Sequence, residues 1–195
     1  MSKPKMSRQA LKICGWTLAC MVIMFGVAFA NRARGGGRLV EEYNITEGQP
    51  RHVKFEKMPM DEPQKAVGWF YKYMGTAQFD LCARLFPEDL LGSLNLEQDQ
   101  KDYEDGIYVK EYVIHGFQTL AADSYADQKA HYEEVAASRE CSEYKVVRVH
   151  FMQNWSDKAL EKDPQWGNGE YTRDFLVGKE SGFRGKWKIL ELGMM

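Results

Sequence analysis

The first thirty residues separate into a charged segment and an uncharged one. Residues 1–12 contain four basic residues and no acidic residue, and residues 13–30 contain no charge. Such an uncharged run is close to the shortest helix that spans a bilayer, and arginines follow it directly. The small residues Ala28 and Ala30 also fit the signal for cleavage after Ala30. We therefore expect a basic cytoplasmic tail and a single transmembrane anchor, with a cleaved signal peptide as the alternative.

The next segment is polar and begins close to three consecutive glycines, which predicts a flexible linker over residues 31–62. A Val-Lys-Phe run at 53–55 is compatible with a short edge strand inside this linker. The linker ends at a helix start signal, because Asp61 is a suitable N-cap and Pro63 fits the first helical turn.

Apolar positions then recur at the spacing of an amphipathic helix. Ala66, Phe70 and Tyr73 share one face, and a glycine ends the run. A second helical pattern stops at Pro87, which cannot continue a helix. These patterns predict helices over 63–74 and 76–86, a short helix or turn over 88–96, and an acidic surface loop over 97–106.

Beyond residue 106 the pattern changes to the period of two that is typical of strands. In the first alternating run, Val113 and Phe117 fall on one face, and Tyr112 and Ile114 fall on the other. Residues 121–140 contain helix formers and no β-branched run, which favours an exposed helix or an irregular crossing. The alternation predicts strands over 107–120, 143–155, 170–180 and 186–192, with a loop over 156–169.

Helices first and antiparallel strands afterwards predict an α+β domain over residues 63–195. The opening pair "AVGWFYKYMGTAQFDLCARLFP" and the closing strands "EYTRDFLVGKE" and "GKWKILELG" resemble the NTF2-like (cystatin-like α+β cone) superfamily. The likeness is greatest to small exported bacterial domains of unknown function, and it covers residues 63–193. It implies N-terminal helices packed on a curved antiparallel sheet, which leaves an open-ended pocket.

Charge narrows the range of partners. Removing the four basic residues of the tail from the total of 26 leaves 22 basic groups against 28 acidic groups, a net charge of −6 for residues 31–195. An acidic domain repels phosphate backbones. We therefore expect no nucleic acid among its partners.

Two cysteines, Cys82 and Cys141, belong to the expected exported domain. Outside the cytoplasm they could form one disulfide, and two buried free thiols are the alternative. The sequence contains no CxxC pair and therefore favours neither a zinc site nor a thioredoxin-type motif. We expect no metal and no cofactor.

A few polar side chains could carry chemistry if they line the pocket that the resemblance implies. His150 shares a strand face with Arg148, and a neighbouring guanidinium would lower the pKa of the imidazole and favour a neutral base. Asp174 could supply a carboxylate. The alternative is that this face meets solvent or a partner, while His115 is a satisfied, partly buried core histidine. No catalytic motif matches, so we assign no catalytic residue. His150 and Asp174 are the weak candidates.

The aromatic residues offer candidate binding positions. Trp166 lies on a loop between strands, where it either folds back over the core or contacts a partner. Tyr112 and Arg148 are further candidates for contact with a ligand or partner. Aromatic side chains of this kind fill a core or line an apolar pocket.

These observations favour a non-enzymatic function. We expect a membrane-anchored, extracytoplasmic NTF2-like module that binds a protein or a small apolar ligand and is able to form a homodimer. One alternative is a scaffold subunit of an envelope or secretion complex, because the VirB8-like assembly proteins share the plan of tail, single span and external domain. The other is a small lyase or isomerase that uses the cone pocket.

Overall fold

The computed structural model describes residues 52–182 and 185–193. The predicted tail and anchor, and the linker as far as residue 51, lie outside the described residues. Within the described ranges, no helix combines the length and the apolar character that a membrane crossing requires.

The described chain contains helices and five strands, which confirms the α+β class. The strands are β1 (His52–Phe55), β2 (Val109–Thr119), β3 (Glu143–Trp155), β4 (Gly169–Lys179) and β5 (Trp187–Leu192). The helices are α2 (Glu62–Gly75), α3 (Phe79–Ala83), α4 (Leu96–Glu104), α5 (Lys129–Ser138) and α6 (Asp157–Leu160), with 3-10 helices η1 (Glu88–Ser93) and η2 (Ala122–Gln128).

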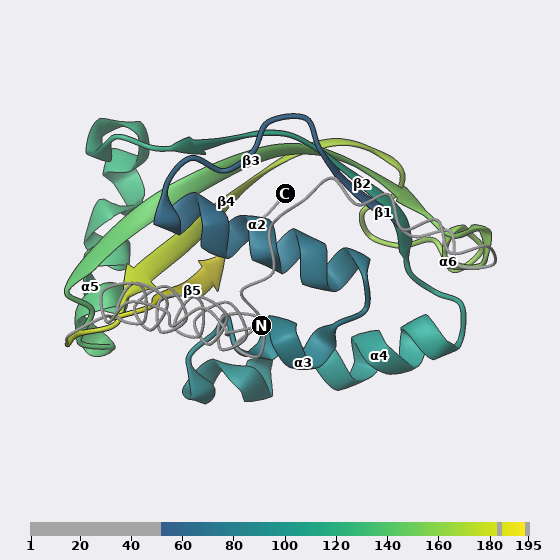
Figure 1. Cartoon of the computed structure of the whole chain (residues 1–195), viewed down its shortest axis with the longest axis horizontal. Coiled ribbons are helices and arrows are strands. Elements are labelled where there is room, and N and C mark those ends of the chain that lie inside the picture. Colours follow the sequence, from purple (N-terminus) through teal and green to yellow (C-terminus); the bar gives the residue numbers. More distant parts are fainter. Residues whose placement is uncertain (1–51, 183–184, 194–195) are drawn as a thin grey trace, which may run out of the picture. The chain divides into compact units, whose positions relative to one another are not determined.

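The five strands form one sheet in the order β1-β2-β3-β4-β5. Strands β2 to β5 are antiparallel to their neighbours, as predicted, but β1 pairs with β2 in parallel, so the sheet is mixed. The parallel pair arises because the Val-Lys-Phe run of the predicted linker is recruited as an edge strand. Figure 1 shows the sheet arching over α2, with α3 and α4 on the same side as α2.

Helix α2 forms because its first turn is capped and its apolar residues share one face. The Asp61 side chain accepts a hydrogen bond from the Gln64 backbone N–H at 2.8 Å and so caps the first turn, while Pro63 fits there without losing a bond. The buried face of the helix carries Phe70 and Tyr71, which pack against the sheet. The sequence prediction for this helix is confirmed.

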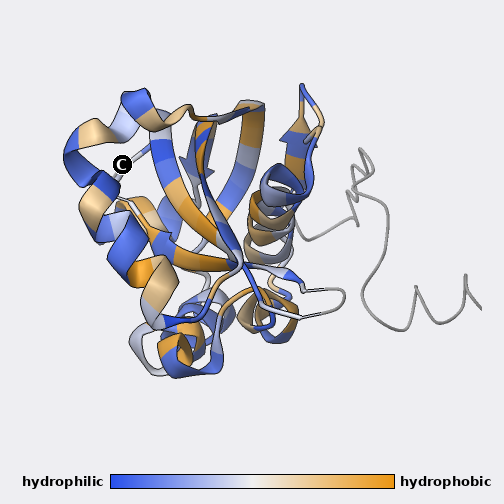
Figure 2. Cartoon of the chain, turned by 90° about the vertical axis from the view of Figure 1, so that its left-hand side faces the viewer, coloured by the Kyte–Doolittle hydropathy of each residue, from blue (hydrophilic) through white to orange (hydrophobic). Residues whose placement is uncertain are grey.

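Two hydrophobic clusters lie on opposite faces of the sheet. The larger contains Val147, Val149 and Phe151 of β3 together with α2, and we call the face that it covers the inner face. The smaller contains Val146 of the same strand and the buried side of α5, and it covers one end of the outer face. The strands consequently alternate between hydrophobic and hydrophilic positions, as Figure 2 shows.

The predicted acidic loop over 97–106 is wrong, because most of it is helix α4. Its Gln, Glu, Asp and Lys residues are acceptable helix formers, and two side-chain bonds of the i, i+4 type support the exposed face, Gln98 to Asp102 and Gln100 to Glu104. Leu96 anchors the helix on the larger cluster. The second predicted helix is also shorter than expected and is limited to α3, while α6 adds a short helix to the predicted loop over 156–169.

A β-bulge in β2 overturns the predicted faces of this strand. The register with β3 shifts between Ile114 and Gly116. An extra residue in one strand reverses the facing of all residues beyond it. Phe117 therefore joins Ile114 on the inner face, where it stacks on Phe55 with ring centroids 6.2 Å apart. Val113 pairs with Met152 and does not share a face with Phe117.

Candidate functional site

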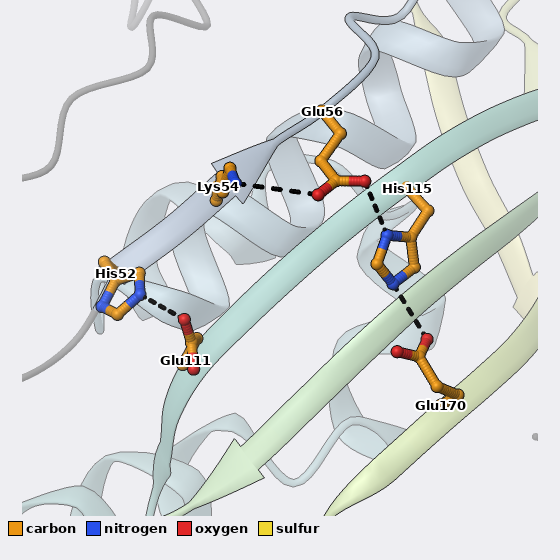
Figure 3. A network of polar contacts seen from close by, with 6 residues as sticks. All are labelled: His52, Lys54, Glu56, Glu111, His115 and Glu170. Atoms are coloured by element: carbon orange, nitrogen blue, oxygen red, sulfur yellow. Dashed lines mark hydrogen bonds and ion pairs between the residues drawn. The ribbon is translucent and has the colours of Figure 1, made fainter.

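The outer face carries a network of histidines and carboxylates, drawn in Figure 3. Lys54 lies on β1 and Glu56 just after it, and Glu170 is the second residue of β4. Between them, His115 Nδ1 lies 2.8 Å from Glu56 Oε2, and His115 Nε2 lies 2.9 Å from Glu170 Oε2. Lys54 Nζ is 3.7 Å from Glu56 Oε1. The bulge in β2 thus moves His115 from the predicted core face to the outer face, where its ring lies between Glu56 and Glu170.

The contacts of His115 favour the protonated, positively charged form of its imidazole ring. A carboxylate can only accept, so both ring nitrogens must carry a proton if both contacts are hydrogen bonds. The hydrogen bond to Glu56, assisted by the charge of Glu170, raises the pKa of His115. The same bond lowers the pKa of Glu56. The expectation of a satisfied, partly buried histidine is therefore confirmed, but its place in the core is wrong, because the ring lies among carboxylates on the outer face.

A second ion pair fastens the other end of β1. His52 Nε2 lies 2.6 Å from Glu111 Oε1, and Asn154 Nδ2 donates to Glu111 Oε2 at 2.7 Å. Burial acts to raise the pKa of Glu111, but these hydrogen bonds outweigh it, and the pKa is lowered. The edge strand is thus held by side chains at both ends as well as by its backbone ladder.

The two weak catalytic candidates lie on the outer face and not beside the inner-face cluster. Arg148 and Asp174 occupy paired positions of β3 and β4 and form a bidentate ion pair, with Nε–Oδ1 at 2.7 Å and Nη2–Oδ2 at 2.8 Å. His150 is exposed, and its Nδ1 lies 2.9 Å from the Thr172 hydroxyl. These groups satisfy one another, which fits a role in holding two strands together.

The inner face presents a different chemistry, dominated by aromatic rings. Tyr71 of α2 lies at the centre, with its ring centroid 5.4 Å from that of Tyr112, 5.0 Å from that of Phe151 and 5.8 Å from that of Phe175. Tyr71 is only 2% exposed, and its hydroxyl is buried without a hydrogen-bond partner. Burial raises the pKa of Tyr71 and of Tyr112, so both phenols stay protonated. An unpartnered buried hydroxyl is costly, and it calls for an explanation.

A single arginine accompanies this aromatic group. The guanidinium of Arg173 lies over the Phe175 ring, 5.8 Å from its centroid, and Nε donates to the Gly193 carbonyl at 2.7 Å. Its positive charge acts on the hydroxyls of both Tyr71 and Tyr112. Burial lowers the pKa of Arg173, and no carboxylate among the described residues pairs with it. Among the described residues, the inner face therefore holds a half-buried cation without a counter-ion.

Asp99 of α4 completes the polar groups near this cluster. Burial, followed by the charge of Asp102, raises the pKa of Asp99. Its charge acts on Tyr112 and on the buried thiol of Cys82. The charges of a cation, Arg173, and of an acid, Asp99, therefore both act on Tyr112.

The rim of the inner face is formed by half-buried aromatic residues. Strand β5 pairs with β4 from Phe175 onward, and Gly193 bonds to Asp174 and Arg173, so the start of β4 before Arg173 has no described neighbour on that side. Tyr171 lies in this stretch, and Trp166 packs against it edge to face, with centroids 6.0 Å apart. The buried Gln153 amide holds the loop by donating to the Trp166 and Gly167 carbonyls, each at 3.1 Å. Of the two alternatives for Trp166, the structure has the ring folded back.

The two cysteines are free thiols in this structure, so the disulfide between Cys82 and Cys141 is not formed. Cys82 is buried in the cluster of the inner face, where desolvation raises its pKa to about 12. Cys141 packs against the cluster of the outer face. A sheet therefore separates the two sulfur atoms.

Hollows lie elsewhere on the described surface, and two of them differ clearly in place. A groove of about 690 Å³ runs between α3, η1 and α4, and its lining mixes leucines with Glu97 and Lys101. A second hollow of about 370 Å³ lies beside Cys141, between the end of α5 and β5. Neither is lined by a residue that the sequence singled out for catalysis, and in each the charges of both signs are mixed.

The sequence identified part of the inner-face cluster. Tyr112 is a predicted binding candidate. It lies in this cluster on the same face of β2 as Ile114, as the alternation of the strand predicts. Arg173 and Tyr71 were missed. A detectable signal existed for Arg173, because it occupies an inward position of β4 whose companions, Phe175 and Val177, are apolar. No such signal exists for Tyr71, whose missing partner is visible only in three dimensions.

We compared the chain with models of protein families, with curated proteins and with solved structures, and none of these comparisons finds a match. The NTF2-like assignment therefore stays a prediction. The functional argument rests on the geometry of the two faces.

Proposed function

We propose that this protein is a membrane-anchored, extracytoplasmic binding module whose inner face receives a small molecule. The observation that carries the proposal is the combination of two groups on the inner face: Arg173, a half-buried cation that has no counter-ion among residues 52–182 and 185–193, and the buried, unpartnered hydroxyl of Tyr71. Stable interiors satisfy such groups. A bound molecule would satisfy both at once, and the NTF2-like arrangement of helices under a curved sheet agrees with this location.

The lyase or isomerase hypothesis loses its named residues, because His150 and Asp174 are engaged on the outer face. The scaffold hypothesis would place the function on that outer face, where the charged side chains are already paired with one another. Neither alternative accounts for the unsatisfied groups around Tyr71.

The proposal is tested by a fragment screen on the full-length chain, with isotope labelling and NMR shift mapping. We expect fragments, both neutral and anionic, to shift the resonances of Tyr112, Tyr171 and the Trp166 indole. Substitution of His150 by Ala or Asp174 by Asn should leave these shifts unchanged. If no fragment moves inner-face resonances, or if the shifts map to the outer face, the proposed binding function is wrong.

The location is tested separately by the mass of the mature protein in membrane and soluble fractions. We expect an intact N-terminus in the membrane fraction. A soluble product that begins at Asn31 would replace the anchor with a cleaved signal peptide and would leave the binding function intact.

A further inference from the structure

We infer that the inner face selects a small molecule that carries one carboxylate on a flat apolar body, with Arg173 as the anchor of the carboxylate. This inference rests on the proposed function and adds the chemical class of the ligand. It is argued from the donors that the inner face offers, from the charge that surrounds them, and from the aromatic surface beside them.

The donors match a planar anion. A guanidinium presents five N–H groups in a rigid fork, and Arg173 uses only Nε, toward Gly193. The four remaining N–H groups make no hydrogen bond to the described residues. Tyr71 adds a hydroxyl donor that also has no partner. Two parallel N–H donors and one hydroxyl suit the two oxygens of a carboxylate.

The opposite face of the same two strands provides an internal comparison. Arg148 lies there, one register position from Arg173 along the strand pair, and it holds Asp174 through two short bonds. Within the described part of the chain, one arginine of this strand pair thus has its own carboxylate and the other has none. A carboxylate from outside would give Arg173 the partner that Arg148 already has.

The surrounding charge favours a single negative charge on the ligand. Arg173 is the cation that acts on Tyr71 and Tyr112, while the charge of Asp99 also acts on Tyr112. The exported part of the chain is acidic. A dianion such as a phosphate monoester would meet one cation and a nearby acid, whereas a monoanion is balanced by Arg173 alone.

The body of the ligand is defined by the half-buried rings next to Arg173. Tyr171 precedes Arg173 by two positions on β4, so both side chains lie on the inner face. The Trp166 ring stands edge-on to Tyr171, with an interplanar angle of 86°. Flat apolar rings make the most favourable contacts with such aromatic surfaces. An aromatic carboxylate is the simplest molecule that combines both requirements.

The test is calorimetry on the full-length chain with 2-naphthoate and with 2-naphthamide, its uncharged match in shape. We expect naphthoate to bind at least ten times more tightly than the amide, since a lost charged hydrogen bond removes about 1.4 kcal/mol or more. R173Q should lower the affinity for naphthoate at least tenfold, and Y71F should lower it about threefold or more. R148Q is the matched control on the outer face and should bind naphthoate like the parent chain.

The outcomes separate the ligand class from the binding function. Equal affinities for acid and amide, or an undiminished affinity in R173Q, overturn the carboxylate class while leaving an inner-face binding site in place. If neither naphthyl probe binds but other fragments still shift the inner face, the class alone is wrong. If R173Q fails to fold, the ratio of acid to amide in the parent chain and the loss in Y71F decide the matter.

Discussion

At the scale of single residues, His115 illustrates how a local irregularity creates a charged contact. The bulge in β2 turns its ring toward Glu56 and Glu170, and the side chain remains 35% exposed. Lys54 and Lys57 are the cations nearby, the first paired with Glu56 and the second packed on Gly116. His150 lies opposite Gly116 and contacts Thr172. The two carboxylates dominate, and they favour the protonated ring.

We expect the pKa of His115, measured by NMR titration of the full-length chain, to fall in E56Q and to fall less in E170Q. The reason is that the hydrogen bond from Glu56 is the largest cause of the raised pKa. A raised pKa in the folded state means that protonated His115 stabilises the fold below its unfolded pKa of about 6.5. This contribution disappears as the pH rises through the folded pKa. An unchanged titration in both variants would contradict the assignment.

At the scale of elements, the junction of α2 and β1 depends on a glycine. A Cβ built on Gly75 would lie 2.2 Å from Cγ2 of Val53 and 3.2 Å from Cδ2 of Tyr112. A contact of that length with a branched side chain forces the strand and the helix apart. The close approach also supports the inner face, because Tyr112 belongs to it.

G75A is therefore expected to lower the free energy of unfolding by about 1–3 kcal/mol, measured by chemical denaturation. G92A is the matched control, since a Cβ at Gly92 has no atom within 4 Å, and it should change stability by no more than about 0.5 kcal/mol. Introducing V53A into G75A should recover part of the loss, because it removes the clashing atom. Additive effects of V53A and G75A would disprove the contact.

The sequence predicts best those elements in which the alternation of apolar and polar residues follows the burial of the side chains. Strand β3 coincides with the predicted range 143–155, and β4 differs from its prediction by one residue at each end. Helix α4 was missed because its residues are mostly polar, and its position depends on Leu96 packing against distant elements. The bulge at His115 was missed because nothing in the alternation of β2 marks the extra residue. Arg173 and Tyr71 come together only through the curvature of the sheet over α2.

At the scale of the whole molecule, the sheet separates the two cysteines. We expect iodoacetamide to modify Cys141 in the native full-length chain and to reach Cys82 only after denaturation, because Cys82 is fully buried and its pKa is raised to about 12. Mass spectrometry of the peptides locates each modification. A peptide pair linked through Cys82 and Cys141 in a non-reducing digest would show that the fold differs from the one described.

The sheet also separates the histidines of the chain from the proposed binding face. All four histidines of the chain lie on the outer side, at His52, His115 and His150 of the strands and at His131 of α5, whose buried side packs on that face. Around the inner face, burial raises the pKa of Tyr71 and of Tyr112 and so keeps both phenols protonated. An arginine keeps its charge near neutral pH.

The affinity for 2-naphthoate should therefore vary by less than about twofold between about pH 6.5 and 8.5, measured by calorimetry. As the pH rises through the raised pKa of His115, its stabilising charge is lost, so the midpoint of thermal unfolding changes while binding does not. H115Q should abolish the His115 part of the change in stability and leave the affinity intact. A fall in affinity that follows the titration of His115, and that vanishes in H115Q, would show that the outer face controls the inner one through the sheet. An affinity that does not change with pH would show that the two faces act independently. The outer face would then affect stability, and the inner face would bind the ligand.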